Sequence, residues 1–334
     1  MGLKSKEGAI HWPSLLLFLI AGCISTAKQF DNTGQKASRD LNLSYFFEVK
    51  IPPGARKVSI WVPLPVSDDH QQLKEYKVSS PLPYSLHKDP EYGNTVLRFE
   101  TTGNLVESLQ VRLDLSVLRL LQVKDGKQAS GRSADSRESL RRFLQPDRLV
   151  PIDGRIAEEA RRVVKNKMSP LEKARAIYEH VVETMAYDKS GTGWGRGDAL
   201  WACDARAGNC TDFHSFFIGM ARASGIPARF VMGFPVPEEK KEGEIPGYHC
   251  WAEFYIPGMG WIPVDASEAW KHPEKKEFFF GNLDPNRVAF TLGRDIRLDT
   301  KLEPLNYLIY PYVLIDGREF SVVRTSVRFA DRLN

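Results

Sequence analysis

Residues 206–214 read RAGNCTDFH, and they place a cysteine directly before an apolar pattern of helical period. Asn209 is a favourable N-cap, so Cys210 is predicted to be the first residue of a helix. The buried stripe of this helix is predicted to consist of Phe213, Phe216, Phe217, Met220 and Ala221, which recur at three- and four-residue steps. The helix is expected to end at Gly225, which has a proline two residues beyond it.

A thiol at a helix start has the chemistry of a nucleophile. The positive end of the helix dipole lowers the pKa of a thiol there and stabilises the reactive thiolate. The first turn also has unpaired backbone N–H groups, including that of Cys210, which can hold an oxyanion on a carbonyl under attack. Gly208 leaves space where a substrate could approach the sulfur.

A thiolate needs a histidine that keeps it ionised and protonates the leaving group, and His249 is the best candidate among seven histidines. It begins a predicted strand, YHCWAEFYI (248–256), whose alternate residues from Tyr248 to Ile256 are expected to face the core. His249 is on the other, less apolar face. The turn PGMG returns the chain to WIPVDAS (261–267), and a hairpin centred near residue 257 pairs His249 with Asp265. Asp265 is therefore the expected orienting carboxylate.

Two longer stretches carry a family resemblance. GNCTDFHSFFIGMARASGIPARFVMGF (208–234) and GYHCWAEFYIPGMGWIPVDAS (247–267) resemble the transglutaminase-like core of papain-like cysteine enzymes. The matching pieces, in order, are G-x-C at a helix start, G-I-P-A-R, H-x-W and G-W-x-x-x-D. The likeness covers roughly residues 165–295. It implies a catalytic triad of Cys210, His249 and Asp265, and an upstream oxyanion donor, for which Trp194 and Trp201 are both candidates.

The implied reaction is thiol-dependent acyl transfer on a peptide or carboxamide bond, without a cofactor or metal. The thiolate attacks the carbonyl, His249 protonates the departing amine, and a thioester remains until water or an amine resolves it. Two alternatives stay open: a peptide-N-glycanase-like amidase, and a non-catalytic envelope binding or assembly module that keeps the fold. The sequence has no calcium loop of the EF-hand type.

Several residues near the motifs have a second interpretation. His214, four residues after Cys210, could be a rival base, although packing or a substrate contact is the simpler expectation. Arg229 is expected to be a structural ion-pair partner rather than a substrate clamp. Outside the cytoplasm, Cys203 and Cys250 could form a disulfide. The residue types that bind zinc are present in Cys203, Cys210, His214, His249 and Cys250, but the sequence has no C-x-x-C or H-x-x-x-H pair, so no metal site is predicted.

The predicted fold class is α+β: an antiparallel β-sandwich followed by a papain-like transglutaminase core, in which a helix carrying the cysteine packs on an antiparallel sheet carrying the histidine and the aspartate. Short apolar strands separated by Pro and Gly turns suggest the sandwich, and a capping box at Ser169–Glu172 begins the helical part. The predicted segments are 1–22 (lipoprotein-type signal peptide), 23–40 (flexible tether), 41–120 (sandwich), 121–150 (linker), 151–295 (catalytic domain) and 296–334 (β-hairpin extension).

The N-terminus predicts export. Two lysines precede a short apolar run that ends at Ile20-Ala21-Gly22-Cys23, which resembles the lipobox of bacterial lipoproteins. The resemblance implies cleavage before Cys23, lipid on its thiol, and a periplasm-facing protein anchored to the membrane. An ordinary cleaved signal is the alternative. The net charge of +4, from 46 basic and 42 acidic residues, is too balanced to indicate nucleic acid as a partner.

Overall fold

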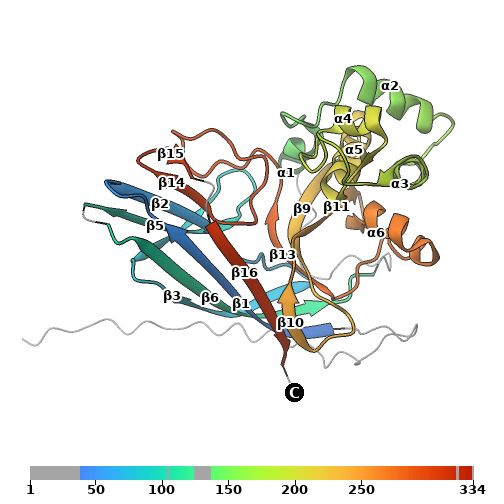
Figure 1. The fold of residues 1–334 in the computed structure, drawn as a ribbon. Helices are drawn as coiled ribbons and strands as arrows, with labels where there is room; N and C mark the ends of the chain where they lie inside the picture. Colours follow the sequence, from blue (N-terminus) through green and yellow to red (C-terminus); the bar gives the residue numbers. More distant parts are fainter. Residues whose placement is uncertain (1–37, 104, 124–136, 321–322, 333–334) are drawn as a thin grey trace, which may run out of the picture.

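The computed structural model describes residues 38–103, 105–123, 137–320 and 323–332 (Figure 1). The predicted signal peptide, Cys23 and nearly all of the predicted tether lie outside these residues, as does much of the predicted linker. The α+β class and the papain-like core are confirmed.

Two five-stranded antiparallel sheets form the sandwich (Figure 1). The first has the order β10-β16-β1-β6-β3, with bounds Glu242–Ile245, Val323–Asp331, Ser38–Lys50, Ser108–Leu120 and Gln71–Ser79. The second has the order β15-β14-β2-β5-β4, with bounds Arg318–Glu319, Tyr312–Ile315, Lys57–Pro63, Thr95–Thr102 and Tyr84–Lys88. Strand β1 shows why the sheets pack face to face: its alternate residues from Leu41 to Val49 are all buried.

The C-terminal strands complete this sandwich, so the predicted separate extension is wrong. A β-hairpin is present, because Asp316-Gly317 turns the chain between β14 and β15. However, β14 pairs with β2, and β16 pairs with β1 from Leu41↔Asp331 to Val49↔Val323. β1 would otherwise offer an unpaired edge, which the C-terminal strand satisfies with main-chain hydrogen bonds.

The second half packs helices on a four-stranded antiparallel sheet of order β12-β11-β9-β13. These strands are Gly260–Val264, His249–Ile256, Ala228–Pro235 and Arg287–Leu292. The helices are α2 (Gly154–Val163), α3 (Pro170–Thr184), α4 (Ala199–Ala205), α5 (Cys210–Ala223) and α6 (Ala266–Lys271). Short elements are α1 (Arg137–Arg141), η1 (Arg142–Leu144), η2 (Pro273–Lys275) and the parallel pair β7 (Ala186–Tyr187) and β8 (Ala207–Gly208). The predicted capping box of α3 is confirmed, with 2.8 Å from Ser169 N to Glu172 Oε2.

One hydrophobic core runs through both halves. Tyr45 of β1 packs against Phe234 of β9 and Phe290 of β13, with ring centroids 5.8 and 6.4 Å apart. Its hydroxyl donates to the carbonyl of Ile309 at 3.1 Å. Figure 1 shows the four-stranded sheet between the sandwich and the helices. The sandwich is therefore part of the support of the four-stranded sheet.

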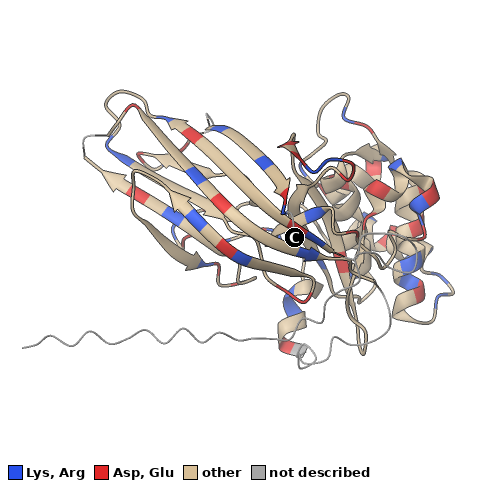
Figure 2. Ribbon diagram, turned by 90° about the horizontal axis from the view of Figure 1, so that it is seen from below, with Lys and Arg blue, Asp and Glu red and all other residues tan. Residues whose placement is uncertain are grey.

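The last residues of the predicted linker also dock onto the core. Arg222 of α5 donates to Asp147 at 2.7 Å, and both side chains are buried. Because a buried guanidinium needs a charged partner, this part of the chain is structural, although the sequence suggested only a link. None of the described helices is long and apolar enough to cross a membrane. Figure 2 shows basic and acidic residues interleaved over both halves.

Candidate active site

Helix α5 begins at Cys210, as predicted, and two side chains cap it. Asn209 Oδ1 accepts from the backbone N–H of Thr211 at 2.9 Å, and Asp212 Oδ2 accepts from the N–H of Asn209 at 2.9 Å. These bonds satisfy donors that a helix start leaves unpaired. The side chain of Cys210 is thereby held at the positive end of a 14-residue helix.

His249 and Asp265 meet in the interior. His249 Nε2 lies 2.7 Å from Asp265 Oδ2, and His249 also shares a side-chain hydrogen bond with Cys210. The three side chains form one connected chain, and Asp265 has no exposed surface. The geometry therefore brings together the three residues that the motifs singled out.

The hairpin register differs from the predicted one. Ala252 pairs with Val264, so the hairpin centre lies one residue further along, and Asp265 falls just beyond β12. It is the N-cap of α6, where its Oδ1 accepts from the N–H of Glu268 at 3.0 Å. Gly260, at φ +77°, absorbs the tight turn. Asp265 thus reaches His249 from a helix cap: its Oδ1 caps α6, and its Oδ2 faces the imidazole.

The electrostatics favour a thiolate beside an imidazolium. A hydrogen bond from Cys250, together with His249, holds the pKa of the Cys210 thiol well below its usual range although burial opposes this. Burial lowers the pKa of His249, but Asp265 and then Cys210 outweigh it and raise the pKa to about 10. The pKa of Asp265 stays well below its usual range against the cost of burial, because His249 and Arg287 stabilise its charge.

Arg287 of β13 is a site residue that sequence reasoning missed. Its Nη1 donates to Asp265 Oδ2 at 2.7 Å, and its Nη2 donates to Asp284 Oδ2 at 2.9 Å. The guanidinium also lies 5.3 Å from the ring centre of Trp251. An arginine in the apolar run from Val288 to Leu292 was the available signal, because a buried charge requires a partner.

His214 is not placed as a rival base. Its Nδ1 lies 2.7 Å from the carbonyl oxygen of Cys210, and its Nε2 accepts from the N–H of Ala266 at 3.1 Å. An acceptor on one side and a donor on the other fix the neutral tautomer that carries its proton on Nδ1. Burial, the largest influence, lowers the pKa of His214. This histidine therefore links α5 to the start of α6.

The loop that contains Gly195 and Gly197 is hydrogen-bonded to the start of helix α5. Asp212 accepts from the N–H groups of Gly195 and Gly197 at 2.7 and 2.9 Å. A Cβ on Gly208, whose φ is +140°, would lie 2.4 Å from Asp212 Oδ2. The predicted role of Gly208 as space for a substrate is therefore wrong, since Asp212 occupies that space.

Neither tryptophan candidate is in contact with Cys210 among the described interactions. Trp201 of α4 packs beneath the loop, and a Cβ on Gly193 would lie 2.5 Å from its Nε1. Trp194 lies in the same loop. In place of the two tryptophans, three tyrosines interact electrostatically with Cys210 through their hydroxyl groups: Tyr187, Tyr248 and Tyr307.

The three tyrosines differ in what their hydroxyls can still do. The Tyr307 hydroxyl donates to the carbonyl of Gly195 at 3.2 Å. The Tyr248 hydroxyl accepts from Asn209 at 3.2 Å and gives its own proton to the hydrogen bond that it shares with the Tyr307 hydroxyl. The Tyr187 hydroxyl has a hydrogen bond with Lys271, which can only donate, so its own proton stays available. Sequence reasoning missed this group because Tyr187 lies in the short strand β7, beyond the end of α3 and 23 positions before the cysteine.

The cysteines are arranged differently from the prediction. Cys203, Cys210 and Cys250 are free thiols, so the predicted Cys203–Cys250 disulfide is wrong for this structure. Cys203 lies on α4 in a charged pocket with Arg206 and Glu159, whereas Cys250 contacts Cys210 and His214.

No group of three or more His, Cys, Asp or Glu side chains in the described part of the chain is arranged to hold a metal. Arg229 forms an ion pair with Glu253 at 2.6 Å, as expected for a structural residue.

Comparisons with known proteins agree with the fold. The profile of the transglutaminase-like superfamily matches residues 157–266. An uncharacterized Haemophilus influenzae protein is 28% identical over an alignment of 324 residues, which covers 81% of this chain and 84% of that protein. A Pseudomonas aeruginosa protein-glutamine gamma-glutamyltransferase is 29% identical over 115 residues, 33% of this chain and 16% of that protein. The crystal structure of a candidate cysteine protease from Cytophaga hutchinsonii shares the fold, with a TM-score of 0.54 at 17% identity, covering 87% of this chain and 98% of that one.

Proposed function

Since this chain is a transglutaminase-like superfamily protein, with the domain at residues 157–266, we propose that it is a thiol-dependent acyl-transfer enzyme acting on peptide or carboxamide bonds. The observation that carries the proposal is the connection Cys210–His249–Asp265, buried at a helix start with the charges of a thiolate and an imidazolium. Structural packing alone gives no reason to bury an ionised thiol, because desolvation opposes the charge.

The first half of the reaction forms a thioester. The Cys210 thiolate attacks the carbonyl carbon, and the developing oxyanion accepts a hydrogen bond from the backbone N–H of Cys210. His249, held by Asp265, gives its proton to the departing amine. A second oxyanion donor comes from the loop side, where Trp194, Trp201 and the Tyr187 hydroxyl are the candidates.

The second half frees the enzyme. His249 is now neutral and accepts a proton from the incoming nucleophile, which attacks the thioester. Water gives hydrolysis, and a primary amine gives transamidation. Both outcomes use the same three residues, so the choice depends on how the acceptor is bound.

The place of action follows from the N-terminal sequence. Export and lipid attachment at Cys23 put the enzyme at the bacterial envelope, facing the periplasm. Its partner there is a peptide or protein substrate, and the anchor is its contact with the membrane.

One experiment separates the possible outcomes. The purified protein is incubated with a glutamine-containing peptide library and a primary amine, and the products are identified by mass. We expect hydrolysed or amine-coupled peptides with the wild type and with Cys203→Ala, and none with Cys210→Ala. Release of glycans from added glycopeptides would favour the amidase alternative. No turnover, with the fold intact and Cys210 unreactive near neutral pH, would overturn the proposal in favour of a non-catalytic module.

A further inference from the structure

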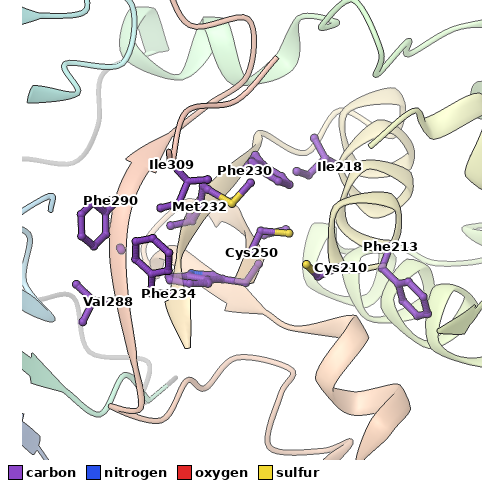
Figure 3. Close-up of a cluster of buried hydrophobic side chains, with 14 of the residues drawn as sticks. Cys210, Phe213, Ile218, Phe230, Met232, Phe234, Cys250, Val288, Phe290 and Ile309 are labelled. Atoms are coloured by element: carbon purple, nitrogen blue, oxygen red, sulfur yellow. The ribbon is translucent and has the colours of Figure 1, made fainter. Parts of the chain in front are cut away.

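Two thiols meet in the site, and the proposed reaction uses only one of them. Cys250 of β11 shares a side-chain hydrogen bond with Cys210 of α5, and Figure 3 shows the two sulfur atoms turned toward each other. Cys250 has no exposed surface. We propose that Cys210 and Cys250 form an oxidative modification site, which takes a peroxide as reactant and ends as a reversible Cys210–Cys250 disulfide.

The two sulfurs have different roles in such a reaction. Cys210 is the one that reacts with peroxide, because its thiolate is stabilised at the helix start and by His249. Burial keeps Cys250 protonated by raising the pKa of its thiol. Cys250 is therefore the resolving thiol, held against its partner.

The surroundings of Cys250 favour this assignment. Its Sγ lies 3.7 Å from His214 Nδ1. The proton on this nitrogen is already donated to the carbonyl oxygen of Cys210. Apolar side chains surround it on the sheet side, among them Met232 and Phe230 (Figure 3). A serine there would put a hydroxyl in an apolar environment, whereas a thiol is tolerated. α5 and β11 already hold the two thiols within hydrogen-bonding reach of each other, so the two partners of the disulfide are neighbours before oxidation.

The chemistry balances with hydrogen peroxide as the oxidant. The Cys210 thiolate attacks one peroxide oxygen, breaks the O–O bond and becomes a sulfenic acid, and the other oxygen leaves as water after taking a proton. The Cys250 sulfur then attacks the Cys210 sulfur. The S–O bond breaks, and the leaving hydroxyl takes the thiol proton of Cys250 to form a second water. Two thiols are oxidised by two electrons, and one peroxide is reduced to two waters.

The disulfide would block the nucleophile and protect it from further oxidation. A sulfenic acid without a neighbouring thiol proceeds to sulfinic acid, which small-molecule thiols do not reverse. The loss and recovery of activity rest on the proposed function, whereas formation of the bond does not. A mass measurement therefore tests this inference even if no turnover is ever found.

Peptide mapping of the full chain is the direct test. Trypsin puts the four cysteines on four separate peptides, and those of interest are 207–222 with Cys210 and 242–271 with Cys250. The protein is treated with a small excess of hydrogen peroxide, alkylated and digested without reductant. We expect peptides 207–222 and 242–271 to appear joined, with near-complete loss of Cys210 alkylation, and dithiothreitol to restore both free peptides.

Two variants sharpen the result. Cys250→Ala should convert the same treatment into sulfinic acid at Cys210 that dithiothreitol does not reverse, and Cys203→Ala should behave as the wild type. Sulfinic acid at Cys210 of the wild type with Cys250 still reduced would overturn the inference, and so would a cross-link through another cysteine. If Cys250→Ala does not fold, the wild-type peptide map decides alone.

Discussion

Arg287 and Asp265 form a buried ion pair, with 2.7 Å between Nη1 and Oδ2 and side-chain exposures of 5% and 0%. The same carboxylate oxygen accepts the hydrogen bond from His249 at 2.7 Å. A guanidinium on β13 therefore fixes the carboxylate that orients the imidazole on β11. This relationship couples the stability of the catalytic sheet to the geometry of the site.

Removing the guanidinium should destabilise the fold. Arg287→Met leaves the buried Asp265 and the half-buried Asp284 without their shared cation, so we expect the free energy of unfolding to fall by about 3–5 kcal/mol. The exposed pair Arg155–Asp204 is the control, and Arg155→Met should cost less than about 1 kcal/mol. Denaturant titration measures both. Equal stabilities for the two variants would contradict a structural role for Arg287.

Removing the orienting charge should slow the chemistry. Asp265→Asn weakens the stabilisation of the His249 imidazolium, so we expect turnover and Cys210 alkylation near pH 6 to fall by about 10²–10⁴-fold. Ser267→Ala is the control, because its hydroxyl contacts only Oδ1 of the same carboxylate, at 3.1 Å. We expect less than about tenfold from it. If both variants react alike, Asp265 does not act through His249.

Alkylation of Cys210 should persist below neutral pH. The thiolate forms above the pKa of the thiol, so a lowered pKa keeps the reactive form present as the pH falls through 7. The imidazolium is lost only as the pH rises through the His249 pKa of about 10. Turnover should therefore have a broad plateau between these limits.

Cys203 is the internal reference for that measurement, because burial raises the pKa of its thiol. It should alkylate only at alkaline pH. Rates followed peptide by peptide in one digest compare the two thiols directly. Parallel pH profiles for Cys203 and Cys210 would contradict the thiolate assignment.

Gly208 should tolerate no side chain. Gly208→Ala adds a Cβ at 2.4 Å from Asp212 Oδ2 on a backbone with φ +140°, so Asp212 must release the loop that it binds. We expect a loss of about 2–4 kcal/mol in stability, together with reduced alkylation of Cys210. Gly258→Ala has a similar backbone penalty at φ +83° but no atom within 4 Å, so its cost should be about 1–2 kcal/mol. An equal cost for both would show that the Asp212 contact is unimportant.

The second oxyanion donor can be assigned by deleting single hydrogen-bonding groups. The Tyr187 hydroxyl is the group whose proton stays available near Cys210, so Tyr187→Phe should lower kcat by about 10–10³-fold with little change in KM. Trp194→Phe and Trp201→Phe remove the two indole donors in the same way. A loss of kcat confined to Trp194→Phe would assign the donor to the loop indole instead.

Local chemistry in the sequence was enough for the helix start and for the three site residues. Asn209, Cys210 and Asp212 lie within one turn, and capping depends only on neighbouring backbone groups. His249 and Asp265 are joined by a short hairpin, so even a register misplaced by a residue kept them close. The predicted fold class followed from the spacing of apolar residues, which is typical of strands in the first half of the chain and has a helical period at the start of the second half.

Contacts between residues distant in the chain were decided by the tertiary structure alone. Strand β16 joins β1 across 274 to 290 positions, and the Arg287–Asp265 pair and the Cys210–Cys250 contact likewise join separate elements. The sequence carries the propensity of each segment but not the identity of its neighbour, because strand pairing and burial are settled by the packing of the whole core. That is why the sequence suggested Cys203 as a possible disulfide partner of Cys250, whereas folding brought Cys250 against Cys210.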